Sequence, residues 1–187
     1  YKDVVAYGAH ARFSDPVLLN GLGVTATFSP ASSLPLSERA HVRADYRRFD
    51  WSGHAAWNNA DFYDLFGPTK TSRRGYDVGI GHTKLLLFDE PRRLTATING
   101  SVAGNLDQLP EYQNVPVRVD HMYTLAGELS YTNVRSSLGN VDDEKGHRWS
   151  LLMHNDVVDT SVFTRVHGTF DLGVALPIGH SSVWLRN

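Results

Sequence analysis

The chain has 187 residues, the size of one domain, with a formal net charge of −2 and no cysteine. This charge gives no basic excess for binding nucleic acid, and the lack of cysteine excludes disulfide scaffolds, thiolate metal sites and cysteine nucleophiles. No apolar run approaches the roughly 18 residues that a membrane-spanning helix needs. A mean hydropathy of −0.30 fits a soluble protein and equally a membrane barrel, whose strands alternate apolar and polar residues.

Alternation of apolar and polar residues with a period of two dominates the sequence and predicts β-strands. Turn signals such as Asp15-Pro16, Asp50-Trp51-Ser52-Gly53 and Glu90-Pro91 separate the alternating segments, and the count is about ten strands. Nine of these segments are residues 4–13, 18–29, 40–47, 76–83, 94–102, 124–132, 148–154, 162–174 and 181–186.

The connections are of unequal length. Long loops are expected at residues 104–116 and 135–146, whereas several hairpins have very short turns. One helix is expected over residues 61–66, where Asp61 can cap its start and Gly67-Pro68 can end it. Short turns at one end of the strands and long loops at the other are typical of outer-membrane barrels.

The polar faces of the predicted strands carry Gly, Ser, Thr, Asn, Arg and His, with opposite charges that can pair, such as Arg43 with Asp45 and Arg165 with Asp171. A narrow polar lumen accommodates such pairs, whereas the outer face of a soluble sandwich favours Lys, Glu and Thr. We therefore predict an all-β, antiparallel up-and-down transmembrane β-barrel, as a single domain over residues 1–187. The expected lumen lining is Arg43, Asp45, Arg47, Arg118, Asp120, Glu128, Arg165, His167 and Asp171.

Two stretches carry a resemblance to a known class of proteins. They are residues 57–76, which include Trp57-Asn58-Asn59-Ala60, and residues 170–186, which end with Val183-Trp184-Leu185-Arg186. Both resemble the C-terminal barrel of envelope proteins in which a TolB-like β-propeller precedes an outer-membrane barrel, and more loosely the bacterial surface antigen (Omp85-like) barrels. The resemblance implies a location in the bacterial outer membrane, a periplasmic propeller domain in the same, longer chain, and further barrel strands. Such barrels commonly finish on an aromatic residue, whereas this chain finishes on Asn187.

One predicted loop gathers basic and aromatic side chains that can contact lipopolysaccharide phosphates or the acidic surface of a partner. The alternative is a solvated loop whose aromatic residues fold over the barrel mouth. The side chains concerned are Phe62, Tyr63, Phe66, Lys70, Arg73 and Arg74.

No motif indicates a cofactor, a metal site or an enzyme. Residues 21–26 match the GxGxxA pattern, but a strand follows them and not the helix that a dinucleotide site requires. The nine histidines form neither HxH nor HExxH, and no serine lies in GxSxG. The sequence therefore predicts a non-enzymatic membrane anchor, pore or translocation module, with outer-membrane lipid and lipopolysaccharide as partners and no nucleic acid. A barrel-embedded hydrolase, for example with Ser150, His167 and Asp171, and a soluble all-β binding module are the alternatives.

Overall fold

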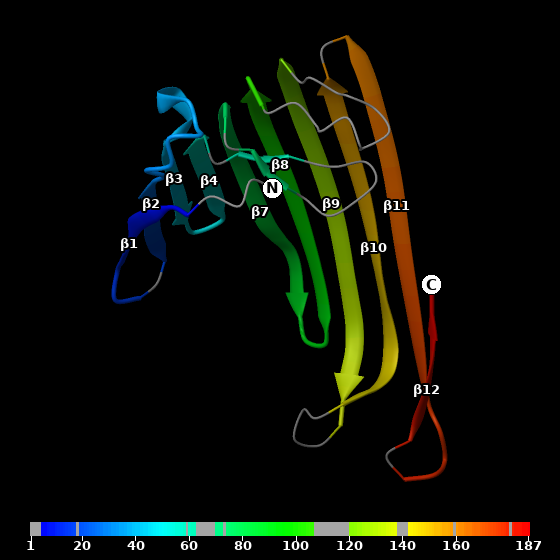
Figure 1. Ribbon diagram of the computed structural model, residues 1–187. Helices are drawn as coiled ribbons and strands as arrows, with labels where there is room; N and C mark the ends of the chain where they lie inside the picture. The colour runs from blue at the N-terminus through cyan, green and yellow to red at the C-terminus, as the bar shows by residue number, and fades with distance from the viewer. Residues whose placement is uncertain are drawn as a thin grey trace. The chain divides into compact units, whose positions relative to one another are not determined.

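Ten β-strands form one sheet in which successive hairpins place each strand beside its predecessor, apart from the separate β5–β6 hairpin (Figure 1). The computed structural model describes residues 5–17, 19–58, 60–62, 70–72, 74–106, 120–137, 142–158, 160–179 and 181–187. Neighbouring strands run antiparallel, which confirms the predicted all-β, up-and-down architecture. In spatial order the strands are β1 (Tyr7–Ser14), β2 (Asn20–Phe28), β3 (Ala40–Arg48), β4 (Trp51–Trp57), β7 (Tyr76–Asp89), β8 (Arg92–Gly104), β9 (His121–Ser136), β10 (Asp143–Val158), β11 (Ser161–Ala175) and β12 (Ser182–Arg186).

Two short elements lie outside this sheet. A 3-10 turn, η1 (Leu36–Glu38), lies between β2 and β3, and β5 (Ala60–Phe62) pairs with β6 (Lys70–Ser72) as a two-stranded sheet. The helix predicted over residues 61–66 is wrong for its first two residues, which belong to β5, and the other four lie outside the described residues. Six residues are too few for a stable isolated helix, whereas pairing with β6 satisfies the backbone of residues 60–62.

Two segments predicted as turn or loop lie partly in strands. The predicted turn at residues 50–53 is displaced, because the chain reverses at Phe49-Asp50, where Phe49 has a φ of 51°, and β4 begins at Trp51. The predicted loop over residues 135–146 is shorter, because β9 continues to Ser136 and β10 begins at Asp143. In both places serine, glycine and charged residues indicate a turn or loop, but the same residue types also fit the polar face of a strand.

The sheet has two free edges in the described part of the chain, namely β1 and β12. A barrel closes when its first and last strands pair, so the described sheet is open. Separately, the described residues include no helix with the length and apolarity to cross a membrane.

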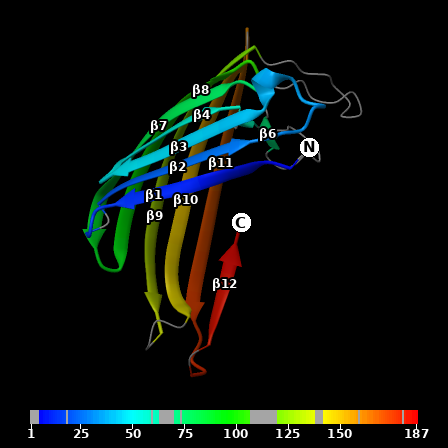
Figure 2. The same ribbon diagram turned by 60° about the vertical axis from the view of Figure 1, so that its left-hand side comes forward.

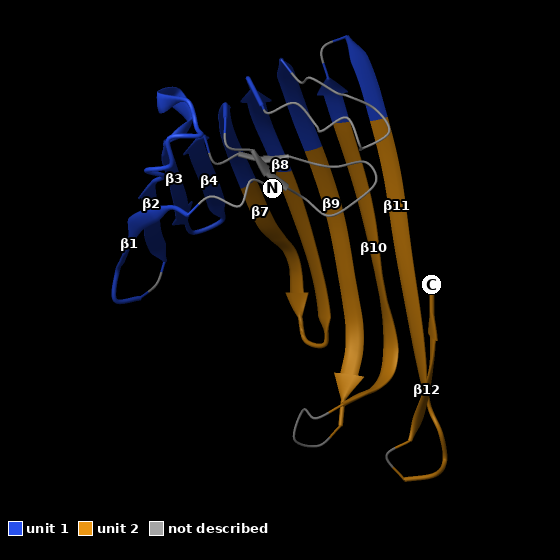
Figure 3. Cartoon of the chain, viewed as in Figure 1, with its two compact units in different colours: residues 1–81, 99–125, 156–163 blue, residues 82–98, 126–155, 164–187 orange. Residues whose placement is uncertain are grey.

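The chain forms two compact units (Figure 3). Unit 1 comprises residues 1–81, 99–125 and 156–163, and unit 2 comprises residues 82–98, 126–155 and 164–187. Unit 1 contains β1 to β4 entirely, and Figure 2 shows β1, β2 and β3 next to one another. Unit 2 contains β12 entirely, beside the larger part of β11.

Strand register in unit 1 separates apolar from polar residues. Phe13 of β1 lies opposite Leu22 of β2, and Leu22 lies opposite Tyr46 of β3. In the next row, Arg12 lies opposite Gly23, and Gly23 lies opposite Asp45. Because paired residues in a sheet point to the same side and successive residues to opposite sides, the rows alternate between an apolar face and a polar face.

The same separation holds in unit 2. Leu172 and Val174 of β11 lie opposite Leu185 and Val183 of β12 and form apolar rows, whereas Asp171 lies opposite Arg186. Within β11 the odd-numbered residues from 165 to 171 are polar, and most even-numbered residues are apolar. Each unit therefore contributes one apolar face and one polar face.

Almost none of this apolar surface is buried. The buried apolar residues among those described are Leu34, Ala56, Ala103 and Leu106. Leu34 comes from the β2–β3 connection and Leu106 follows β8, so two of the four lie outside the main sheet. The alternating apolar side chains of the strands thus form no internal core within the described residues.

Candidate functional site

The apolar face is the first functional feature of the sheet, because its large side chains stay exposed. In unit 1, Phe13 is 61% exposed and Ile80 is 60% exposed, and in unit 2 Val166 is 66% exposed and Leu185 is 67% exposed. Monomeric soluble proteins rarely expose contiguous apolar surface on this scale, and such surface marks contact with a membrane or a partner. The face can therefore contact lipid or another protein.

One pair of polar residues on this apolar face is hydrogen-bonded. Thr164 of β11 lies on the same side as Val162 and Val166, and its hydroxyl donates to Asn155 Oδ1 of β10 at 2.7 Å. A hydrogen-bonded pair costs less to remove from water than two separate polar groups. Both residues thus remain compatible with an apolar surrounding.

A hollow of about 570 Å³ on the polar face of unit 1 is the second functional feature. Its lining comes from β1, β2, β3, β4, β7, β8 and β9, all within unit 1. The size falls in the range of small-molecule sites, about 300–1,000 Å³. The polar side chains of the lining are His10, Arg12, Asp45, Arg47, Ser52, His54, Asn99, Ser101 and Thr124.

Two rows of paired residues build the hollow. Arg12, Gly23, Asp45 and His54 follow one another across β1, β2, β3 and β4. In the adjacent polar row, Ser14, Gly21, Arg47 and Ser52 follow one another across the same four strands. β2 therefore contributes a glycine to each row, and the absence of side chains there leaves space between the arginines of β1 and β3.

The acidic side chain that lines the hollow, Asp45, is paired. Arg43 Nε lies 3.1 Å from each carboxylate oxygen of Asp45. His54, also in the lining, donates from Nε2 to Asp77 Oδ2 at 2.9 Å, and Asp77 is buried. By contrast, neither Arg12 nor Arg47 has an ion-pair or hydrogen-bond partner for its guanidinium in the described part of the chain.

The pair of His54 and Asp77 is the arrangement that comes closest to catalytic geometry in unit 1. Ser52 lies two residues from His54 on the same strand face, but no hydrogen bond joins Ser52 to His54 among the described residues. A hydrolytic triad needs the base within hydrogen-bond reach of the nucleophile. The pair can therefore orient His54, while contact between nucleophile and base is not formed.

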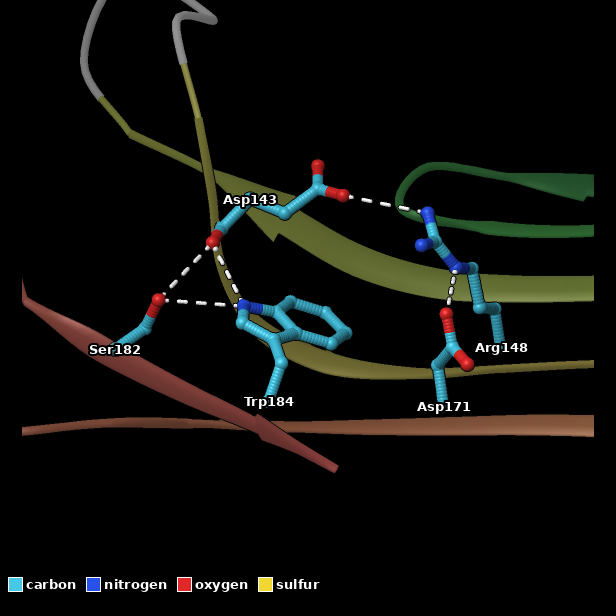
Figure 4. Close-up of polar contacts among 5 residues, drawn as sticks. All are labelled: Asp143, Arg148, Asp171, Ser182 and Trp184. Carbon is cyan, nitrogen blue, oxygen red and sulfur yellow. Dashed lines mark hydrogen bonds and ion pairs between the residues drawn. The ribbon is translucent and has the colours of Figure 1, made fainter. Parts of the chain in front are cut away.

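Unit 2 carries a polar cluster that is satisfied internally (Figure 4). Arg148 of β10 lies between two carboxylates, with its Nε donating to Asp171 at 2.7 Å and its Nη1 lying 3.4 Å from Asp143. The indole Nε1 of Trp184 in β12 donates to the backbone oxygen of Asp143 at 3.1 Å and lies 3.2 Å from Ser182 Oγ. These contacts tie β12 and β11 to β10, which indicates a structural role for the cluster.

The structure places the predicted lumen residues in several surroundings. Arg43 pairs with Asp45 as the sequence predicts, and Asp45 and Arg47 line the hollow. For Asp171 the predicted partner was Arg165, six residues away on the same strand, but the carboxylate binds Arg148 across the strands. Arg165 is half-buried, Arg118 lies outside the described residues, and the remaining predicted residues Asp120, Glu128 and His167 are exposed.

Most of the predicted basic and aromatic loop lies beyond what the structure describes. Arg74 is exposed and follows residues whose placement is not described. Phe62 and Lys70 belong to β5 and β6, and their side chains are not described. Tyr63, Phe66 and Arg73 lie outside the described residues, so the structure does not test the predicted loop surface.

Some residues in or next to the hollow are not among the predicted site residues. His10 and Arg12 alternate with Ala9, Ala11 and Phe13 in β1, and this signal could have placed them on a polar face. His54 and Asp77 come from strands 23 residues apart in sequence, and only the strand order brings them together.

A metal site requires several ligating side chains close together. Among the residues that the structure describes, no group of three or more His, Asp or Glu side chains is close enough to hold a metal ion.

The triad that the sequence suggested, Ser150, His167 and Asp171, is not assembled. Ser150 Oγ lies 2.7 Å from Thr169 Oγ1, and Asp171 binds Arg148.

Comparison with models of protein families, with curated proteins and with solved structures gives no match to this chain.

Proposed function

We propose that the chain forms part of the wall of a bacterial outer-membrane β-barrel and serves a larger envelope protein as a non-enzymatic anchor, pore or translocation module. The observation that carries this proposal is the division of the sheet into an exposed apolar face and a polar face with paired charges. In a barrel wall the apolar face contacts lipid and the polar face lines the lumen.

Strand length supports the proposal. A tilted strand needs about 9–11 residues to cross the hydrocarbon region of a bilayer. β9 and β10 have 16 residues each, and β11 has 15 residues. These strands are long enough to cross a membrane and to extend into the water at their ends.

The exposed apolar surface is costly in water. Removing apolar surface from water contributes roughly 25 cal/mol per Å², and the described chain buries almost none of the large apolar side chains of its strands. A soluble sandwich buries such a face against a second sheet, and the described residues form no second sheet of comparable size. Lipid is the surrounding that covers the whole face without a second sheet.

Backbone satisfaction adds a requirement to the proposal. No water is available in the hydrocarbon region to pair with free N–H and C=O groups, so a sheet within a membrane has to close. β1 and β12 therefore have to be paired in the membrane, with each other or with further strands.

Single cysteines test the lipid-facing assignment, and the absence of native cysteine makes each label unique. We expect Val166→Cys in lipid vesicles to react slowly with a water-soluble maleimide and His167→Cys, one residue further along β11, to react much faster. The protein should also need detergent or lipid to fold, with a β-rich circular dichroism spectrum and a heat-dependent gel mobility. A monodisperse, β-rich protein in plain buffer, with both cysteines equally reactive, would overturn the proposal and favour a soluble binding module.

A barrel-embedded hydrolase is the second candidate, favoured by the His54–Asp77 pair beside Ser52 on one strand face. Labelling of the folded protein by a fluorophosphonate probe, abolished by Ser52→Ala and by His54→Ala, would support it. Ser150→Ala is the matched control, because Ser150 bonds to Thr169 in unit 2. Absence of labelling in the folded protein would leave the non-enzymatic role.

A further inference from the structure

The hollow in unit 1 contains two arginines that lie on either side of strand β2. Arg12 is on β1 and Arg47 on β3, two strands away and two residues along. A strand spacing of about 4.8 Å and a rise of about 3.4 Å per residue place their Cα atoms roughly 12 Å apart. Both side chains are exposed, so their guanidinium groups can turn toward a ligand lying between them.

Glycines make the floor. A Cβ atom placed on Gly21 would meet only the backbone oxygen of Phe13, at 3.9 Å. A Cβ atom on Gly23 would meet His10 Cε1 at 3.6 Å and the backbone oxygen of Asp45 at 4.0 Å. These are ordinary van der Waals contacts, so a Cβ atom fits at either glycine, and the His10 ring is the side chain next to Gly23.

The charge of the hollow is uneven. The carboxylate of Asp45, which lines the hollow, is engaged by Arg43. Arg12 and Arg47 have no such partner within the described residues and contribute two uncompensated positive charges. A planar guanidinium fork binds carboxylate and phosphate groups in a bidentate manner.

We propose that this hollow binds a small anion bearing two phosphate or carboxylate groups, one at Arg12 and one at Arg47. The glycines of β2 admit the body of the ligand. The polar groups of the ligand can hydrogen-bond to Ser52 and Asn99. The side-chain oxygens of these two residues lie next to Gly81. This inference depends only on the polar face. It would therefore still hold if the apolar face did not contact lipid.

The test is isothermal titration calorimetry of the full chain, folded in detergent micelles or in buffer, at about 0.15 M salt, where weak surface attraction is screened. Inorganic pyrophosphate and citrate are the probes, and their relative affinity distinguishes a phosphate ligand from a carboxylate ligand. We expect one saturable site and a loss of affinity of roughly tenfold or more in Arg12→Gln and in Arg47→Gln, since charged hydrogen bonds are lost. Arg93→Gln, which removes an exposed arginine of unit 2 that lies near Glu90, should leave the affinity unchanged.

A second variant fills the hollow and keeps both arginines. Gly21→Val adds a side chain whose Cβ meets only the backbone oxygen of Phe13, at 3.9 Å, and raises strand propensity, so we expect the circular dichroism spectrum to be preserved and the binding to be lost. Gly127→Val is its control, because a Cβ there meets nothing within 4 Å and residue 127 belongs to unit 2. Absence of saturable binding of either probe would overturn the proposal. Losses of affinity in Arg12→Gln and Arg47→Gln that equal the loss in Arg93→Gln would overturn it too.

Discussion

The substitution Val166→Arg gives the most direct test of what the apolar face contacts. Val166 lies on β11 with its side chain 66% exposed, two residues before Gly168, the middle residue of the strand. At a rise of about 3.4 Å per residue and a tilt near 45°, this position is roughly 5 Å from the centre of a hydrocarbon region centred on the strand. That region extends about 15 Å to either side, so the position stays within it after a considerable shift of the strand.

The expected cost follows from this depth. Arginine on the lipid face of a barrel costs about 2–4 kcal/mol near the bilayer midplane. This range corresponds to a reduction of the folded-to-unfolded ratio by roughly 30-fold to 1,000-fold. On a face exposed to water the same substitution would change stability by about 0.5 kcal/mol or less.

The matched control is His167→Arg, which introduces the same side chain one residue further along, on the polar face. Its expected effect is within about 1 kcal/mol, because water and polar groups surround it. The assay is urea titration in lipid vesicles, with the folded fraction read from gel mobility without boiling. Equal midpoints for the two variants would refute the assignment of the apolar face to lipid, as would a Val166→Arg midpoint equal to that of the parent chain.

Two further substitutions test the packing inside each unit. Asn58→Gly should lower the free energy of unfolding by about 2–4 kcal/mol, because the buried Asn58 side chain donates to two backbone oxygens and accepts from the amide of residue 75. Asn105→Gly, at an exposed residue with the same positive φ of 54°, should change it by less than about 1 kcal/mol. Gly173→Val should destabilise by about 1–3 kcal/mol, because a side chain there would collide with the indole ring of Trp184. Gly168→Val, on the opposite face of the same strand, has room for the side chain and should be tolerated. Denaturant unfolding followed by tryptophan fluorescence measures the stability of all four variants. Equal effects of the two asparagine variants, or of the two glycine variants, would contradict the packing described.

The sequence predicts the strands well where one face is uniformly apolar. In β3, Ala40, Val42, Ala44 and Tyr46 alternate with charged or histidine side chains, and the predicted strand differs from the observed strand by one residue. The sequence predicts a turn where β4 begins, because Asp50, Ser52 and Gly53 are residue types typical of turns. Local composition therefore determines a strand only when the apolar half of the pattern is strong.

Partners on the polar face depend on register, which alternation does not determine. Arg165 and Asp171 share a strand face, but six residues at about 3.4 Å each separate them by roughly 20 Å. Arg148 lies on the neighbouring strand and reaches Asp171 at 2.7 Å. A list of polar-face residues could therefore be derived from the sequence, whereas the ion pairs among them required the pairing of β10 with β11.

The hollow shows why a functional site in such a sheet cannot be predicted from the sequence of any single strand. Gly21 and Gly23 look like ordinary small residues within β2, and each becomes meaningful only because an arginine lies opposite it on a neighbouring strand. The same register that leaves this space on the polar face places Leu22 between the two glycines on the apolar face, where it is 37% exposed. Shifting β2 by one residue would bury Leu22 among the charges and expose the glycines on the apolar side. Selection for an apolar outer face thus fixes the register that also keeps the hollow open, so the surface proposed to contact lipid and the site proposed to bind anions depend on the same strand pairing.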